Sequence, residues 1–256
     1  MTASLSCPAP ETRLIDAGPE PLVLHQPGSS APAAWVIMVH APGENRTGNN
    51  YWQARAADAL ARAGFAAVRF DLSGYGESLG RMNAGIWDEQ LRGAVKVAVE
   101  SGATAVHVTG RGLHSALLAG LAVPGLRIAL YPPSAADLNW WSGPGRAGPR
   151  DGQIEAAHRP EPAERAFWEA CGAESSLIGG FACPVAVIDA LVQRIAAASQ
   201  DDWDLVVAAA DDRRPRSARL ICGRDPLTRL ESDRAGLERL LTGWLRGVRA
   251  LPAGAA

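Results

Sequence analysis

The sequence has no apolar run long enough to cross a membrane, few cysteines and almost no lysine. No stretch approaches the roughly 18–20 consecutive apolar residues that a membrane-spanning helix needs. The N-terminal segment has neither the basic start nor the apolar core of a secretory signal peptide, so a cytoplasmic protein is expected. The cysteines form no Cys-x-x-Cys pair and no cluster with histidine at metal-binding spacing, which predicts reduced thiols and no metal site. They are Cys7, Cys171, Cys183 and Cys222.

The charge balance is close to neutral. The 256 residues include 25 basic and 27 acidic ones, giving a net charge of −2, and 47% are apolar. These values exclude a disordered chain and a basic nucleic-acid-binding protein. Lys96 is the only lysine, but the arginines alternate with acidic residues along the chain, which is typical of a solvated surface.

Apolar segments of strand length alternate with segments of helical periodicity. Ala34–His40 is a continuous apolar run, which is typical of a strand buried on both faces. This alternation predicts an α/β fold, a mainly parallel sheet with helices on both faces. The predicted strands are Thr12–Asp16, Pro21–His25, Ala34–His40, Phe65–Phe70, Ala105–Thr109, Arg127–Tyr131, Trp203–Ala210 and Ala218–Cys222. The predicted helices are Tyr51–Ala63, Ile86–Glu100, Leu113–Leu121, Pro184–Ala197 and Ser232–Val248.

The middle of the chain breaks this alternation. From Ser134 to about Gly180 it is rich in glycine, proline and tryptophan, which indicates an excursion above the sheet. We therefore expect a single domain over residues 1–256 with a cap inserted at about 134–182. Trp140, Trp141 and Trp168 in this cap would either line a pocket or pack the cap itself.

The segment AWVIMVHAPGENRTGNNYWQARAADALARAGFAAVRFDLSGYGESLG resembles the first half of an α/β-hydrolase. That family has a strand ending in His-Gly, a helix, and a strand ending in Asp-x-x-Gly-x-Gly-x-Ser. Here His40 is followed by Ala41, whereas Asp71, Gly74, Gly76 and Ser78 match the second motif. The resemblance covers residues 20–133 and, loosely, 184–248. Within the superfamily the chain is most similar to serine-aminopeptidase-like esterases and to hydrolases associated with exosortase and exopolysaccharide loci.

The resemblance also locates the position of the catalytic nucleophile. Serine hydrolases of this fold carry it in Gly-x-Ser-x-Gly on a sharp strand-to-helix turn, the nucleophile elbow. The corresponding turn here is GRGLH, so Gly112 occupies the nucleophile position and His114 that of the last glycine. Glycine has no side chain with which to attack a substrate. Ser115 would be an alternative nucleophile only if the site were displaced by three residues into the helix.

Two other patterns suggest different chemistry. Gly76–Gly80 is a formal Gly-x-Ser-x-Gly around Ser78, but no strand and helix flank it closely. Residues Gly110–Ser115 also match a dinucleotide fingerprint, which requires an acidic residue at the end of the next strand. Tyr131, Pro132 and Pro133 stand there instead, so nucleotide binding is the weaker alternative.

The catalytic acid and base are expected later in the chain. Asp211 and Asp212 follow the penultimate predicted strand, and Asp225 lies near the position of the catalytic histidine. No histidine follows His158. A carboxylate with an ordinary pKa near 4 is a poor base for a serine hydroxyl at neutral pH.

Two histidines remain candidates because they follow strands at their carboxyl ends, where α/β folds bind ligands. His40 and His114 would either bind an anion, act as an acid–base pair, or simply line a pocket. The predicted pocket comprises His40, Ala41, Pro42, Leu113, His114, Trp140 and Trp141.

The sequence therefore predicts a hydrolase fold whose catalytic triad is eroded. It would bind a small-molecule, acyl or sugar ligand as an accessory protein, without a cofactor, and a homo-oligomer is compatible with the sequence. One alternative is an active esterase or thioesterase that uses Ser78 with His40 or His114. The other is a nucleotide-binding protein.

Overall fold

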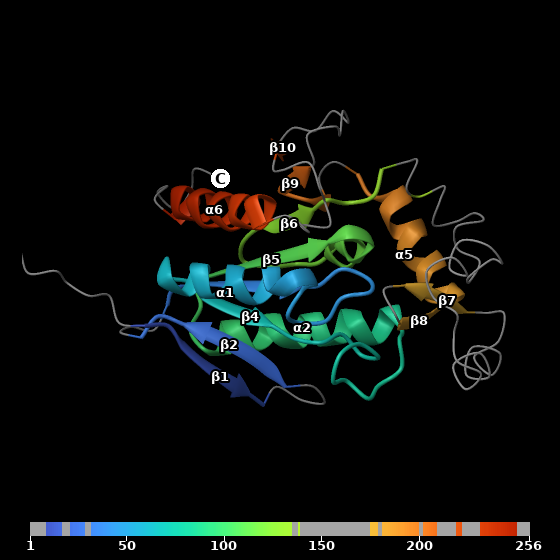
Figure 1. Cartoon of the computed structure of the whole chain (residues 1–256), viewed down its shortest axis with the longest axis horizontal. Helices are drawn as coiled ribbons and strands as arrows, with labels where there is room; N and C mark the ends of the chain where they lie inside the picture. The colour runs from blue at the N-terminus through green and yellow to red at the C-terminus, as the bar shows by residue number, and fades with distance from the viewer. Residues whose placement is uncertain are drawn as a thin grey trace, which may run out of the picture.

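The computed structural model describes residues 9–16, 21–28, 32–134, 138, 175–178, 181–199, 202–208, 219–221 and 231–249. Its main element is an eight-stranded sheet with the order β1-β2-β4-β3-β5-β6-β9-β10 (Figure 1). The strands are β1 (Glu11–Ile15), β2 (Leu22–Gln26), β3 (Ala34–Val39), β4 (Ala66–Arg69), β5 (Ala105–Arg111), β6 (Arg127–Leu130), β9 (Leu205–Ala208) and β10 (Arg219–Ile221).

Six neighbouring strands, from β4 to β10, run parallel, and among the described strands of this sheet only the pairs β1–β2 and β2–β4 at one edge are antiparallel. Parallel neighbours need crossover connections, and the helices supply them on both faces of the sheet. The predicted α/β class and mainly parallel sheet are confirmed.

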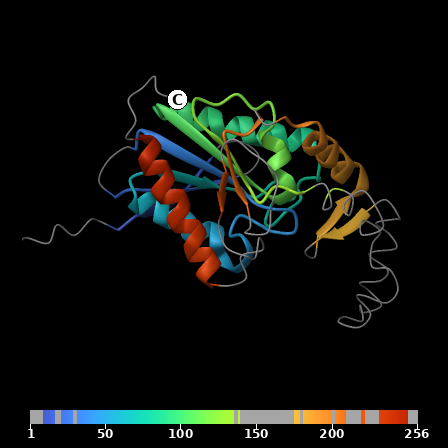
Figure 2. The same cartoon turned by 90° about the horizontal axis from the view of Figure 1, so that it is seen from above.

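The two faces of the sheet are covered by different helices (Figure 2). One face packs against α1 (Trp52–Arg62) and α6 (Glu231–Arg249), which Arg55 and Glu238 join by an ion pair of 3.2 Å. The other face packs against α2 (Ala84–Glu100), α5 (Val185–Ala197) and the short helix η2 (Gly112–Leu118).

Strand β3 shows why its sequence is apolar throughout. Val36 and Met38 belong to the core under α1 and α6, whereas Trp35, Ile37 and Val39 belong to the core under α2 and α5. Because successive side chains of a strand point to opposite faces, a strand covered on both faces places each of its side chains in one of the two cores.

Helix α2 begins two residues before the predicted Ile86. The side chain of Asn83 accepts hydrogen bonds from the backbone N–H groups of Gly85 and Ile86, at 2.8 and 3.2 Å. Asparagine at this position satisfies N–H groups that the first turn of a helix leaves unpaired.

The prediction of a helix at Leu113–Leu121 was wrong in the type and the extent of the helix. The segment forms a seven-residue 3-10 helix that ends at Leu118, and Gly120 follows with a φ of +70°. Every residue from Leu113 to Leu118 is buried, so the segment has no solvated face. A run of apolar residues buried all round gives no periodicity that distinguishes the two helix types.

The predicted cap falls mostly outside the described residues. Within it the structure shows a two-stranded antiparallel hairpin, β7 (Ser175–Ile178) and β8 (Phe181–Pro184), and β8 leads directly into α5. Trp140, Trp141, Trp168 and His158 lie outside the described part. Among the described helices, none is both long and apolar enough to span a bilayer.

Candidate functional site

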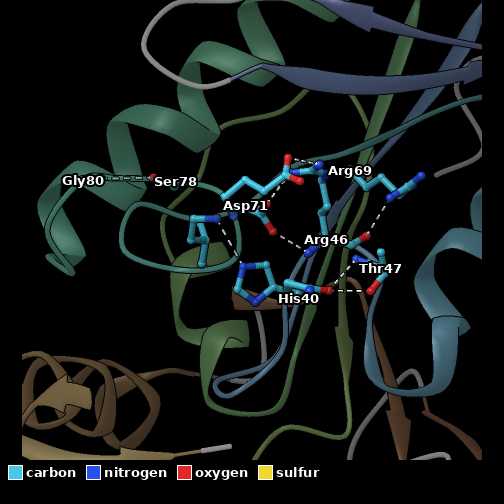
Figure 3. Close-up of polar contacts among 10 residues, drawn as sticks. His40, Arg46, Thr47, Arg69, Asp71, Ser78 and Gly80 are labelled. Atoms are coloured by element: carbon cyan, nitrogen blue, oxygen red, sulfur yellow. Dashed lines mark hydrogen bonds and ion pairs between the residues drawn. The ribbon is translucent and has the colours of Figure 1, made fainter. Parts of the chain in front are cut away.

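The candidate site lies where β3, β4 and β5 end. Parallel strands end at the same edge of a sheet, so the loops that follow them meet there. These loops cover residues 40–51, 70–83 and the start of η2. Figure 3 shows the polar contacts that join the first two loops around His40, Arg46 and Asp71.

Asp71 organises the loop after β4. Its carboxylate accepts hydrogen bonds from the backbone N–H groups of Arg46 at 2.7 Å and Glu77 at 3.1 Å, and it forms an ion pair with the Arg46 guanidinium. A Cβ on Gly76, whose φ is +53°, would lie 2.4 Å from this carboxylate. Only glycine fits there. The Asp-x-x-Gly-x-Gly motif thus builds the loop and leaves Asp71 no free oxygen for chemistry at the mouth.

His40 links the ends of β3 and β4. Its Nε2 accepts a hydrogen bond from the backbone N–H of Leu72 at 3.2 Å, so its Nδ1 carries the proton and donates to the carbonyl of Ala41 at 2.9 Å. The side chain is fully buried, and this burial lowers the pKa of His40. Both ring nitrogens are therefore engaged by the backbone.

His114 lies beside His40 in a buried aromatic cluster. Its Nδ1 donates to the carbonyl oxygen of His40 at 2.7 Å. Its ring contacts those of His40, Tyr75 and Trp87 edge-on, with centroid distances of 5.5, 5.5 and 5.0 Å. Burial holds the pKa of His114 well below its ordinary value. The buried Nε2 has no hydrogen-bond partner among the described residues.

This arrangement differs from the expectation that both histidines line an open pocket. The carboxyl ends of β3 and β5 lie under the loops that follow them, so both rings are fully buried. Of the predicted pocket residues, Ala41 and Pro42 are partly exposed, whereas Leu113 is buried. Gly112, at the predicted nucleophile position, is also partly exposed.

Gly112 follows β5 directly and has a φ of +57°. A Cβ placed there would lie 3.7 Å from the Cβ of Ala41 and 3.8 Å from the Cδ of Pro42, which are ordinary van der Waals distances. A strained left-handed residue at the end of a strand is the backbone shape of a nucleophile elbow. The backbone and the clearance that a nucleophile needs are thus present at a residue that has no side chain.

The two candidate serines lie elsewhere. Ser115 is fully buried and donates its hydroxyl proton to the carbonyl of Gly112 at 2.7 Å. Ser78 lies in a turn, where its backbone N–H donates to Tyr75 at 2.9 Å and its Oγ accepts a hydrogen bond from Gly80 at 3.4 Å (Figure 3). No strand-turn-helix geometry surrounds Ser78, because α2 begins only at Ala84.

The dinucleotide fingerprint also lacks its usual setting. It requires a helix whose N-terminus faces a pyrophosphate. Residues Gly110–Ser115 instead lead into the seven-residue 3-10 helix η2. A Cβ on Gly110 would lie 3.0 Å from the Cα of Ser115, so this glycine permits close packing between strand and helix.

A buried ion pair that was not predicted from the sequence lies beside Gly112. Glu44 pairs with Arg111, and the other oxygen of its carboxylate accepts hydrogen bonds from the N–H of Ala41 and the Nε1–H of Trp52, both at 3.2 Å. The Arg111 guanidinium lies over the Trp52 ring, 4.9 Å from its centroid. The sequence does contain one indication of this pair, because Arg111 lies between Gly110 and Gly112 at the end of a strand predicted to be buried. A buried charge requires a partner of opposite charge.

The remaining predicted catalytic residues, Asp211, Asp212 and Asp225, lie outside the described part of the chain. Within the described part, no group of three or more histidine, cysteine or acidic side chains has metal-binding geometry. A hollow of about 590 Å³ lies between α2 and α5 at the far end of η2, beside Leu117 and Gly120. Of the predicted pocket residues that the structure describes, none lines this hollow.

Comparisons with known proteins identify the fold. No protein-family model and no curated protein matches the sequence. Est1E from Butyrivibrio proteoclasticus, with ferulic acid bound, is 14% identical with a TM-score of 0.60, over 93% of this chain and 100% of that one. A soluble variant of monoglyceride lipase from Saccharomyces cerevisiae is 13% identical with a TM-score of 0.58, over 95% and 97% of the two chains. An esterase from Pyrococcus furiosus is 12% identical with a TM-score of 0.52, over 93% and 92%. The chain therefore has the α/β-hydrolase fold, which it shares with esterases, lipases and thioesterases.

Proposed function

We propose that this protein binds a small ligand at the mouth of its sheet without hydrolysing it. The observation that carries this proposal is Gly112, which has the backbone conformation and clearance of a nucleophile position but no side chain. The triad is eroded at a second place as well, because no histidine follows His158 to serve as the base.

The surroundings of Gly112 support the same conclusion. Hydrolases of this fold stabilise the oxyanion with the N–H of the residue after the nucleophile and an N–H from the loop after β3. In that loop the N–H of Ala41 is donated to Glu44, and Pro42 has no N–H to donate. Neither Ala41 nor Pro42 therefore offers a free N–H to an oxyanion in the ligand-free protein.

The proposed ligand is an acyl, sugar or other small molecule. Two structural neighbours were solved with ferulic acid and with a substrate analogue bound, which supports a small organic ligand for this fold. The resemblance to exosortase-associated hydrolases supports an accessory role in a surface-polysaccharide or protein-sorting pathway. The protein would act in the cytoplasm. Trp140 and Trp141 are proposed as additional pocket walls.

Treatment with a fluorophosphonate probe tests the proposal, because such probes label only an activated serine. The protein is incubated beside an active serine esterase, and intact mass and peptide mapping follow. We expect no adduct on this protein while the esterase labels fully. A stoichiometric adduct on Ser78 or Ser115 would overturn the proposal in favour of an active esterase. Thermal stabilisation by NAD or NADP would instead support the nucleotide-binding alternative.

A further inference from the structure

We propose that Arg111, the N–H of Ala41 and the Nε1–H of Trp52 form a carboxylate-binding site that Glu44 fills in the ligand-free protein. An acidic ligand at the mouth of the sheet would displace the Glu44 side chain and take its place. This inference rests on the proposed binding role and names the chemical class of its ligand, a carboxylic acid with an apolar body.

The donors around Glu44 are those that a carboxylate requires. One oxygen faces the Arg111 guanidinium, and the other accepts the N–H groups of Ala41 and Trp52. Charged and neutral donors are thus distributed over both oxygens. The ring of Trp52 supports the guanidinium from its face, which fixes the direction in which the guanidinium points.

The ion pair is difficult to explain by stability alone. The side chains of Arg111 and Glu44 are only 2% and 6% exposed, so both charges have lost most of their hydration. Apolar residues of similar size are often at least as stabilising as such a buried pair. A buried pair beside a ligand-binding position therefore suggests a role in recognition.

The position of the pair connects it to the mouth. Arg111 immediately precedes Gly112. The Cβ of Ala41 would lie 3.7 Å from a Cβ at position 112, so Ala41 borders the space that a nucleophile would occupy. Ala41, Pro42, Gly43 and Gly112 are partly exposed. A ligand whose carboxylate binds Arg111 would thus place its apolar part above Gly112, where the absence of a side chain leaves room for it.

The first test replaces Glu44 by alanine and supplies the missing carboxylate from solution. We expect the Tm of Glu44→Ala to fall, and then to rise by several degrees in a saturable manner with formate or acetate at constant ionic strength. Chloride and acetamide should not restore it. Asp88→Ala is the matched control, because it leaves Arg194 without its carboxylate at a partly exposed ion pair, and acetate should not rescue it.

The second test measures binding on the unmodified protein, and a variant serves only to assign one resonance. The indole N–H resonance of Trp52, assigned with Trp52→Phe, is followed by NMR during titration with hexanoate and with hexanamide. We expect a saturable shift with hexanoate alone, because displacement of Glu44 changes the acceptor of this N–H.

The outcomes separate this inference from the proposed function. A folded Glu44→Ala on which acetate acts no more than chloride, or an unmodified protein whose Trp52 resonance is unchanged by tens of millimolar hexanoate, would overturn the carboxylate site. Either result leaves the absence of hydrolysis unaffected. Labelling by fluorophosphonate would overturn the absence of hydrolysis and leave the carboxylate site intact.

Discussion

Replacing Gly112 by serine restores the hydroxyl that the hydrolase fold normally presents at this position. The added Cβ meets Ala41 and Pro42 at 3.7 and 3.8 Å, so no neighbour has to move. The main cost is conformational, because the φ of +57° is unfavourable for a residue with a Cβ by about 1–2 kcal/mol. Reduced freedom of the unfolded chain offsets about 0.4–1 kcal/mol of this.

We therefore expect Gly112→Ser to lower the free energy of unfolding by about 1 kcal/mol and the Tm by about 2–4 °C. Gly112→Ala is the matched control, since it has the same backbone cost and no hydroxyl. Urea unfolding of both variants measures the loss. A loss above about 3 kcal/mol in both would contradict the clearance, because it would require a steric clash.

The same variant tests whether a general base serves position 112. A positioned general base contributes about 10²–10⁴-fold to such reactions. Neither nitrogen of His40 is available, because Leu72 and the Ala41 carbonyl engage them. We expect Gly112→Ser to hydrolyse p-nitrophenyl esters no faster than Gly112→Ala and to remain unlabelled by fluorophosphonate. Labelling at position 112 would refute this reasoning, because it would show that a base and an oxyanion site persist.

Three further substitutions test other parts of the account. Asp71→Asn should lower the free energy of unfolding by about 1–3 kcal/mol, because an amide cannot accept hydrogen bonds from all the donors that the carboxylate binds. An unchanged midpoint of urea unfolding would contradict the role of Asp71 in the loop. Asn83→Ala should cost about 1 kcal/mol by loss of the α2 cap, whereas a substitution of the exposed Glu89 should not. His107 is buried, its Nδ1 accepts the N–H of Leu126 at 3.3 Å, and burial lowers its pKa to about 4. Between pH 4 and 6.5 the unfolded state therefore binds more protons than the folded state, so the free energy of unfolding decreases as the pH falls through that range. His107→Gln should reduce the slope of the free energy of unfolding against pH by up to one proton. An unchanged slope would show that His107 does not titrate on unfolding.

Several elements could be predicted from the sequence because their signals are local. The continuous apolar run of β3 indicates a strand buried on both faces, and alternation with helices indicates a parallel sheet. The resemblance to α/β-hydrolases placed Gly112 at the strand-to-helix turn, and the structure gives this residue a φ of +57°.

Other features depend on contacts between distant residues and could not be predicted. Glu44 and Arg111 are 67 positions apart, and only the fold brings their charges together. The burial of His114 likewise depends on Tyr75 and Trp87, which belong to another loop and helix. The sequence does not reveal the type of η2, because a helix buried on all sides has no amphipathic pattern.

The rate of ester hydrolysis tests the central claim most directly, because it detects any nucleophile and not only serine. Release of p-nitrophenol from acetate, butyrate and octanoate esters is compared for the unmodified protein, for Gly112→Ala and for buffer. We expect all three rates to be equal at every substrate concentration. Saturable turnover by the unmodified protein that labelling and mapping trace to its own side chains would contradict it.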